Sequence, residues 1–239
     1  MLKGRAAIVT GAGTGIGREI VLRLLAGGVR VAGVGRRQDP LEALAREARE
    51  GTAGDAGFAA VPCDIRREEE VHRAVEAAHA RLGRISILVN NAGVAEYGPV
   101  GRLTTEVWDR AMETNLRGPF FFTRALLPEM LAAREGHVVM NISVAGVTAF
   151  GGCGAYGASK AGLLGFTRVL REETAGTGVR VTAVIPGATD TAMWERPKAP
   201  PRERLMPARA VADAVLWALS TEASVVPEEI LLRPEGGDL

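Results

Sequence analysis

Residues 10–17, Thr-Gly-Ala-Gly-Thr-Gly-Ile-Gly, are the stretch that decides the fold. The apolar run at residues 5–10 leads into this stretch and is typical of a buried strand, whereas residues 16–25 carry apolar side chains at helical spacing. A glycine-rich turn between a strand and a helix lets the backbone approach a phosphate, whose negative charge suits the N-terminus of the helix. The glycines do not follow the usual G-x-G-x-x-G spacing. A plain tight turn therefore remains the alternative to a dinucleotide site.

Strand-like and helix-like segments alternate along the rest of the chain. Strands are expected at residues 29–35, 57–63, 85–90, 136–143, 179–185 and 230–233, and helices at residues 40–50, 67–82, 103–135, 156–166 and 208–220. Pro119 and Pro128 are expected to bend or interrupt the longest of these helices. The alternation predicts an α/β fold with a doubly wound parallel sheet of about seven strands, a Rossmann fold, in a single domain over residues 1–239. The polar, proline-rich segment at about residues 187–207 is interpreted as a substrate loop or lid.

The overall composition excludes several classes of protein. Net charge is +1, and the 29 basic and 28 acidic residues are intermixed, so no nucleic-acid or membrane surface is expected. No apolar stretch reaches the about 18 residues of a membrane span, and residues 1–5 lead straight into the first expected strand, so neither a membrane helix nor a signal peptide is expected. Two cysteines fit a reducing compartment, and we expect a cytoplasmic protein. No metal site is expected, and His72 and His79 are interpreted as ordinary surface or half-buried residues.

Tyr156 and Lys160 lie four residues apart at the start of an apolar run that predicts a helix, so both side chains project from one face. A free tyrosine titrates near about 10. An ammonium about 5 Å away, at an effective dielectric constant of about 20, favours the phenolate by about 3 kcal/mol. That energy would bring the pKa of the phenol towards about 8, which suits a general acid and base. An ordinary solvated pair is the alternative.

The ends of the second and third strands indicate which cofactor would bind. An acidic residue at the end of the second strand holds the ribose of NAD, whereas an arginine accommodates the 2′-phosphate of NADP. Here Gly35 stands where the acid is expected and Arg36 follows, which favours NADP, although Arg36 could simply be solvated. Asp64 and Ile65 close the third strand at a position suited to an adenine ring. Asp64 could equally cap the next helix.

Asparagine and lysine are rare in this chain, so each one is a candidate for a specific role. The asparagines are Asn90, Asn91, Asn115 and Asn141, and the lysines are Lys3, Lys160 and Lys198. Asparagine side chains after a strand, as at Asn90 and Asn91, can fix the local backbone and the neighbouring strand ends. Ser143 lies at the carboxyl end of the fifth expected strand, where ligands bind in open α/β sheets.

Four motifs in register show that the chain resembles the short-chain dehydrogenase/reductase family over essentially its whole length. They are the turn at residues 10–17, the Asn90-Asn91-Ala92-Gly93 motif, the set Asn115, Ser143, Tyr156 and Lys160, and Pro186-Gly187 with Thr191. The resemblance implies that Tyr156 exchanges a proton with the substrate oxygen and that Ser143 hydrogen-bonds this oxygen. It also implies that Lys160 holds the nicotinamide ribose and lowers the pKa of the phenol. Asn115 would position a water through its helix backbone.

The resemblance extends to the cofactor and substrate contacts. Cofactor contacts are expected from Gly11, Thr14, Gly15, Ile16, Gly17, Arg36, Asp64, Ile65, Asn90, Ala92, Gly93, Tyr156, Lys160, Pro186, Gly187, Thr189 and Thr191. Substrate contacts are expected from Ser143, Ala145, Tyr156 and Trp194. Thr14 departs from the pattern, because NADP-preferring members of the family often carry a basic residue there, so the NADP preference rests on Gly35 and Arg36 alone.

We therefore expect an NADP-dependent oxidoreductase that interconverts a secondary alcohol and a carbonyl. The tail at residues 228–234 is similar to that of the family's NADP-dependent serine and 3-hydroxy acid dehydrogenases, which favours a 3-hydroxy acid or 3-oxoacyl type of small-molecule substrate. The alternatives are an NAD-dependent alcohol or sugar dehydrogenase and a dinucleotide-binding regulator without turnover. As in the family, a homotetramer or homodimer is expected.

Overall fold

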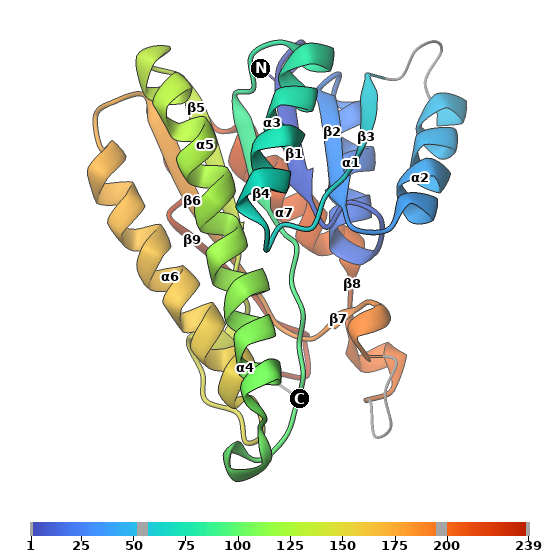
Figure 1. Cartoon of the computed structure of the whole chain (residues 1–239), viewed down its shortest axis with the longest axis vertical. Helices are drawn as coiled ribbons and strands as arrows, with labels where there is room; N and C mark the ends of the chain where they lie inside the picture. The colour runs from blue at the N-terminus through green and yellow to red at the C-terminus, as the bar shows by residue number, and fades with distance from the viewer. Residues whose placement is uncertain (1, 52–56, 195–199, 238–239) are drawn as a thin grey trace.

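The computed structural model describes residues 2–51, 57–194 and 200–237. Its main sheet has seven strands, all paired in parallel, in the order β3-β2-β1-β4-β5-β6-β9 (Figure 1). The bounds are β1 (Ala6–Thr10), β2 (Arg30–Gly35), β3 (Phe58–Pro62), β4 (Ile87–Asn90), β5 (Gly136–Asn141), β6 (Val179–Pro186) and β9 (Glu229–Leu232). The strand order reverses between β1 and β4, so the predicted doubly wound Rossmann-type sheet is confirmed.

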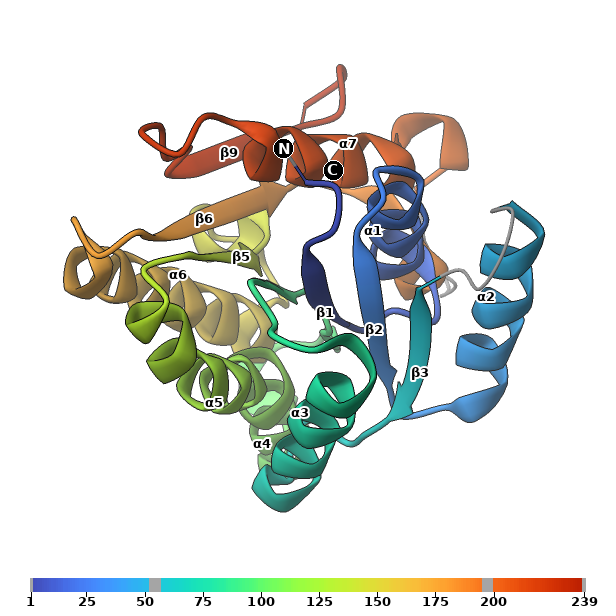
Figure 2. The same cartoon turned by 90° about the horizontal axis from the view of Figure 1, so that it is seen from above.

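Helices cover both faces of this sheet (Figure 2). One face carries α1 (Gly15–Ala26), α2 (Gln38–Gly51) and α7 (Ala208–Ser220), and the other carries α3 (Glu68–Leu82), α4 (Thr105–Met112), α5 (Gly118–Ala132) and α6 (Gly154–Thr174). The helix expected at residues 103–135 is divided into α4, a π-helical turn at Glu113–Arg117, and α5. Pro119 follows the π-helical turn near the start of α5, and Pro128 lies inside α5 without ending it.

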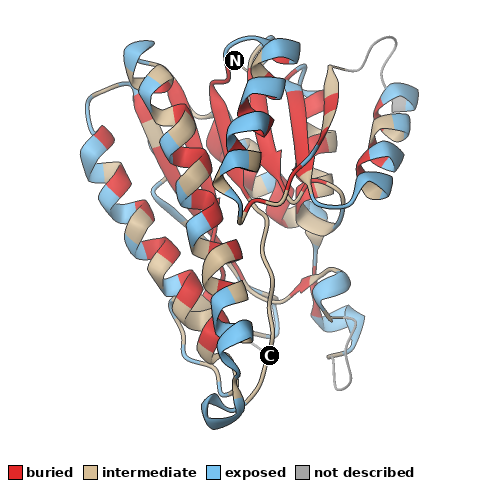
Figure 3. Cartoon of the chain, in the orientation of Figure 1, coloured by how far each residue is buried: buried red, intermediate tan, exposed pale blue. Residues whose placement is uncertain are grey.

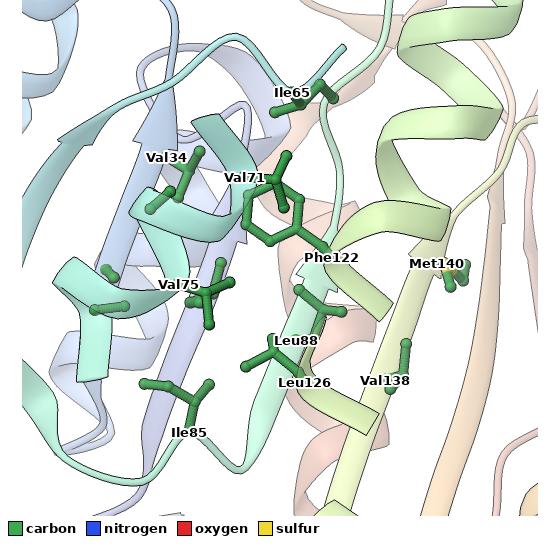
Figure 4. Packing of buried hydrophobic residues seen from close by; sticks show 14 of the residues in the cluster. Val34, Ile65, Val71, Val75, Ile85, Leu88, Phe122, Leu126, Val138 and Met140 are labelled. Carbon is green, nitrogen blue, oxygen red and sulfur yellow. The ribbon is translucent and has the colours of Figure 1, made fainter. Parts of the chain in front are cut away.

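The core consists of two apolar layers, one on each face of the sheet. In the layer under α3 and α5, Phe122 and Leu126 pack against Leu88, Val71 and Val75 (Figure 4). Burying a side chain of this size contributes about 1.5–3 kcal/mol. The inner strands are buried on both faces, whereas the edge strand β9 is partly exposed and each helix turns a buried side inwards and an exposed side outwards (Figure 3). This packing holds the carboxyl ends of the strands, and therefore the residues after them, in fixed positions.

Two expectations about the chain's connections are refined. β5 ends at Asn141, so Ser143 lies in the loop beyond the strand and not on its last residues. The expected lid segment contains a two-stranded sheet, in which β7 (Thr189–Asp190) pairs with β8 (Met206–Pro207). Residues 195–199 of that segment lie outside the described residues, and the movement of a lid stays a prediction. None of the helices in the described part of the chain has the length and apolarity needed to cross a membrane.

Candidate active site

A cavity of about 870 Å³ lies beyond the carboxyl ends of the strands. Its walls come from the turn between β1 and α1, from the residues after β2, β3, β4, β5 and β6, from α6, and from β7 and the residues that follow it. Open α/β sheets bind ligands in the crevice where the strand order reverses, and here that reversal lies between β1 and β4. The cavity therefore occupies the position at which this architecture holds a dinucleotide.

The glycine turn at one end of the cavity is built for close backbone approach. Gly11 and Gly15 have φ values of +67° and +54°, the left-handed region that favours glycine. A Cβ on Gly11 would lie 2.8 Å from the Cα of Ala92, which is closer than carbon atoms can pack. Thr14 at the N-cap of α1 makes no side-chain capping bond, and the first turn has no acidic residue. The N–H groups of α1 are thus left to bind an anion, as a diphosphate requires.

The residues after β2 and β3 form the next part of the wall. Gly35 and Arg36 line the cavity, and so do Asp64 and Ile65. The Asp64 carboxylate accepts hydrogen bonds from the backbone N–H and the guanidinium of Arg66, which hold the pKa of that carboxyl below its usual value. The expectation that Asp64 caps the following helix is wrong. Arg67 is the N-cap residue of α3, three residues after Asp64, and the Asp64 carboxylate binds Arg66 instead.

Asn91 connects three strand ends beneath the cavity. Its Nδ2 donates to the backbone oxygen of Thr10 at 3.0 Å, and its Oδ1 accepts from Nδ2 of Asn141 at 2.8 Å. The hydroxyl of Thr10 in turn accepts from the backbone N–H groups of Asn91 and Ala92, at 3.0 Å each. These bonds hold the ends of β1, β4 and β5 together.

Asn90 and Gly17, both expected to contact a cofactor, do not line the cavity. Successive residues of a strand point to opposite faces, so Asn90 turns away from Asn91 and donates to the Thr123 hydroxyl at 3.3 Å. Gly17 packs under the glycine turn instead, since a Cβ there would lie 2.2 Å from the Gly11 carbonyl oxygen. Both residues support the site from behind its wall.

Asn115 is fully buried within the π-helical turn and also lies behind the wall. Its side chain bonds both the N–H and the carbonyl of Val94, at 2.8 and 2.9 Å, and donates to the Ser159 hydroxyl at 2.9 Å. Ser159 donates in turn to the Tyr156 carbonyl at 2.7 Å. Asn115 therefore fastens α6 to the segment after β4. π-Helical turns in proteins are frequent at functional sites.

Tyr156 and Ser143 meet inside the cavity. Both are buried, and their side chains share a hydrogen bond. Ser143 also accepts the N–H of Ala145 at 3.2 Å, which orients its hydroxyl at the start of the loop after β5. The ring of Tyr97 lies 6.3 Å from the ring of Tyr156, centre to centre, on the same wall. A phenol and a hydroxyl that converge in this way can hold one oxygen atom of a small molecule between them.

Lys160 lies one helical turn beyond Tyr156 and is 3% exposed. Its ammonium donates to the backbone oxygen of Asn141 at 2.8 Å and lies 6.0 Å from the centre of the Tyr156 ring. Burial penalises the charged amine and lowers the pKa of Lys160 to about 8.

The expected lowering of the phenol's pKa by this amine is not found. Burial raises the pKa of Tyr156 above its ordinary value, and the hydrogen bond with Ser143 only partly opposes that rise. The physical reason is desolvation: the phenolate would be enclosed in protein, and the amine is already engaged by the Asn141 carbonyl. The sequence alone could show the spacing of the two groups but not their burial.

Most of the residues expected to contact a cofactor or a substrate line the cavity. Those that line the cavity are Gly11, Thr14, Gly15, Ile16, Arg36, Asp64, Ile65, Ala92, Gly93, Ser143, Ala145, Tyr156, Lys160, Pro186, Gly187, Thr189, Thr191 and Trp194. Asn90, Gly17 and Asn115 are the exceptions already described. The cavity that contains Ser143 and Trp194 is also lined by Tyr97, Phe150, Cys153 and Met193. Among the described residues, no group of three or more side chains could hold a metal ion.

Asn91 connects neighbouring strand ends, as expected for the asparagines after β4, whereas reasoning from motifs alone gave no role to Asn141. Both bind side chain to side chain across strands that are far apart in the sequence. The scarcity of asparagine was the available signal, because all four asparagines gather around this cavity or directly behind its wall.

Comparison with known proteins gives consistent matches. The family model described as short chain dehydrogenase matches residues 5–201. An uncharacterized oxidoreductase of Staphylococcus haemolyticus is 34% identical over 233 residues, covering 98% of each chain. Among solved structures, the closed form of serine dehydrogenase complexed with NADP⁺ has a TM-score of 0.89 at 31% identity and covers 98% of this chain and 96% of that chain. A metagenomic short-chain oxidoreductase in complex with NADP has a TM-score of 0.85 at 32% identity, with 98% of each chain covered.

Proposed function

The chain belongs to the short chain dehydrogenase family of oxidoreductases, and we propose from that premise that it interconverts a secondary alcohol and a carbonyl with NADP(H). The observation that carries the proposal is the convergence of Tyr156, Ser143 and Lys160 in the cavity that also contains the glycine turn. The cofactor, when bound, supplies or accepts the hydride, and the protein binds, orients and exchanges the proton.

The roles of the side chains follow from their contacts. Ser143 holds the substrate oxygen, because its hydroxyl already faces the phenol of Tyr156. Tyr156 gives its proton to that oxygen in the reduction and takes it back in the oxidation. Its raised pKa suits the neutral phenol as a donor, and the buried site protects the transferred proton from bulk water. Lys160 is the one basic group of the three; it lines the cavity and would hold a ribose of the cofactor.

The residues of the cavity fit a dinucleotide. The glycine turn and the uncapped N-terminus of α1 suit a diphosphate, and Asp64 and Ile65, which line the cavity, would contact the adenine. Arg36 lines the cavity with no carboxylate at Gly35, which favours a 2′-phosphate and hence NADP. Two structural relatives hold NADP in their crystals, which supports the same preference here.

The substrate we propose is a 3-hydroxy acid or 3-oxoacyl type of small molecule. The similarity to serine dehydrogenase supports this choice. The substrate would lie between Ser143 and Trp194, against Ala145 and the ring of Tyr97. The segment at about residues 187–207 would close over it, and Thr191 and Trp194 already reach the cavity wall.

The experiment that tests this function is a nicotinamide absorbance assay at 340 nm with purified protein. The panel contains 3-hydroxy acids, secondary alcohols, sugars and their carbonyl counterparts, each with NADP(H) and NAD(H). We expect turnover with NADP(H) on a 3-hydroxy acid or its 3-oxo counterpart. Turnover only with NAD(H) on alcohols or sugars would support the NAD-dependent alternative. Tight binding of a cofactor without turnover of any compound would support a regulator.

We propose a homodimer or homotetramer in the cytoplasm. Large apolar side chains lie exposed on the outer helices, with Trp108 on α4 at 42% and Trp217 on α7 at 59% exposure. Contacts between subunits would cover these side chains. Light scattering coupled to size-exclusion chromatography measures the assembly directly, and a monomer would contradict the proposal.

A further inference from the structure

Lys160 is joined to the glycine turn by a chain of hydrogen bonds that crosses three strand ends. The ammonium of Lys160 donates to the backbone oxygen of Asn141 at 2.8 Å. The Nδ2 of Asn141 donates to Oδ1 of Asn91 at 2.8 Å, and the Nδ2 of Asn91 donates to the backbone oxygen of Thr10 at 3.0 Å. Thr10 directly precedes Gly11, the first residue of the turn.

The amide-to-amide bond continues the sheet beyond its last backbone pairing. The ladder between β4 and β5 ends with the pair Asn90 and Met140. Asn91 directly follows Asn90, and Asn141 directly follows Met140. At this position a hydrogen bond between the two side chains stands in place of a backbone pairing. Beyond that pair, Asn91 is held by Thr10 and Asn141 is paired with β6, and the side-chain bond links these two segments directly.

The Asn91 amide has little freedom to move. A Cβ on Gly17 would lie 2.5 Å from its Nδ2, and a Cβ on Gly11 would lie 3.0 Å from the same atom. The amide is therefore enclosed by the turn itself. A shift of Asn141 would be passed to the turn, because close-packed interiors transmit displacement and do not absorb it.

We propose that Asn141 is a positioning residue, which sets the spacing between Lys160 and the glycine turn through its bond to Asn91. This inference rests on the proposed function, in which Lys160 and the turn hold the nicotinamide ribose and the diphosphate of one cofactor. In a dinucleotide a short CH₂–O link joins the nicotinamide ribose to the diphosphate, which limits the distance between these two groups. The spacing of the two protein elements therefore decides how well the cofactor binds and how well it is oriented for reaction.

The cost of this side chain to stability favours the same interpretation. The Oδ1 of Asn141 is buried and has no hydrogen-bond partner among the described residues. A buried amide oxygen without a partner destabilises the folded state, and an apolar side chain would avoid that penalty. Asn141 is therefore explained better by the position it imposes on Asn91 and Lys160 than by stability alone.

The test uses two variants of Asn141 in the full-length protein. Asn141→Leu removes the polar side chain, and Asn141→Asp keeps its shape but has no N–H to donate to Asn91. The dissociation constant of NADP is measured by fluorescence titration, and kcat and KM are measured with the best substrate of the panel. We expect the dissociation constant to rise about tenfold in each variant, with a further fall in kcat and little change in the KM of the alcohol.

A second measurement needs no cofactor. Hydrogen–deuterium exchange followed by mass spectrometry reports the protection of peptides that cover residues 10–17 and 88–95. We expect faster exchange in both peptides for Asn141→Asp, because the turn loses its anchor on β5. A double-mutant cycle with Asn91→Leu should show strong coupling, the double variant binding NADP about as weakly as either single variant.

Thr182→Val is the matched control. It removes another buried side-chain hydrogen bond between β5 and β6, the one to His137 at 2.8 Å, but away from the cavity. We expect it to lower the melting temperature while leaving NADP binding and the exchange of residues 10–17 unchanged.

The outcomes separate the inference from the proposed function. Wild-type NADP affinity and wild-type exchange in both Asn141 variants would overturn the positioning role while leaving the oxidoreductase intact. Additive effects in the cycle with Asn91→Leu would overturn it as well. Failure of the unchanged protein to bind either NADP or NAD would overturn the proposed function, and the positioning role with it.

Discussion

The ammonium of Lys160 lies 6.0 Å from the centre of the Tyr156 ring, and both residues are almost completely buried. Burial acts on the two groups in opposite directions. It raises the pKa of the phenol and lowers the pKa of the amine to about 8, so in each case the neutral form is favoured. Catalysis near neutral pH therefore starts from a neutral tyrosine, whose proton the Ser143 hydrogen bond helps to direct.

Replacement of Tyr156 by phenylalanine should remove turnover and preserve cofactor binding. The variant keeps the ring and its packing against Tyr97 but has no proton to exchange. We expect kcat to fall by about 10²–10⁴, the usual contribution of a general acid or base. The absorbance assay measures kcat, and a fluorescence titration measures NADP affinity. Turnover at the wild-type rate would contradict the role assigned to Tyr156.

Replacement of Lys160 by methionine should stabilise the fold at pH 7 and abolish catalysis. The ordinary pKa of lysine is 10.5, and in the folded protein it falls to about 8, so burial of the charged amine destabilises the fold below pH 8. The penalty disappears as the pH rises from 8 through 10.5. The pKa shift of Lys160 corresponds to about 3 kcal/mol of destabilisation. The variant gains this amount minus the contribution of the hydrogen bond that it loses to the Asn141 carbonyl.

Urea denaturation of the wild type and of Lys160→Met, at pH 7 and at pH 10, measures how the difference in stability changes with pH. The advantage of the methionine variant should be present at pH 7 and should shrink at pH 10. An advantage that grows with pH would contradict the assignment of the low pKa to Lys160.

His137 should make the protein sensitive to acid. It is fully buried on β5, and burial lowers its pKa to about 3, with Arg180 and Arg5 adding to the effect. The unfolded chain takes up a proton near pH 6.5 and the folded chain does not, so stability from this residue is complete above pH 6.5 and declines as the pH falls towards 3. Between pH 6.5 and 4 the loss should amount to about 3 kcal/mol.

The measurement is the free energy of unfolding at pH 6.5, 5 and 4 for the wild type and for His137→Gln. The variant should show a shallower decline, because glutamine cannot take up the proton. Thr182→Val retains the histidine and should keep the steep decline. An equal decline of the free energy of unfolding with falling pH in the wild type and in His137→Gln would rule out His137 as the source of the acid sensitivity.

Gly35→Asp should move cofactor preference from NADP towards NAD. A Cβ at Gly35 would meet Leu41 at an ordinary 3.6 Å, so the substitution fits without strain. The new carboxylate would repel a 2′-phosphate beside Arg36 and accept a bond from the 2′-hydroxyl of NAD. We expect the ratio of the dissociation constants of NADP and NAD to change by about tenfold to a hundredfold, because a hydrogen bond to a charged group contributes a free energy of that size. Arg37→Ala, whose residue does not line the cavity, is the matched control.

Much of the architecture was open to prediction from local patterns. The glycine turn follows a strand-like run and precedes a helical one, and α7 begins and ends where its apolar spacing predicted. The four-residue spacing of Tyr156 and Lys160 was enough to place them on one helix face, because helix geometry is the same in every fold. Asn90 and Asn91 show the limit of such patterns. Adjacent strand residues must face apart, but which of the two faces the cavity depends on how the sheet packs.

The sequence by itself determined the order of strands and helices, the glycine turn and the order of the candidate catalytic residues, since these depend on short-range spacing and backbone preference. Only the tertiary structure decided that Asn141 meets Asn91, that Asn115 binds Val94 and Ser159 behind the wall, and that burial raises the pKa of Tyr156. The physical reason is that hydrogen bonds across strands and the loss of water around a charge depend on which distant segments pack together. No local pattern in the chain records that packing.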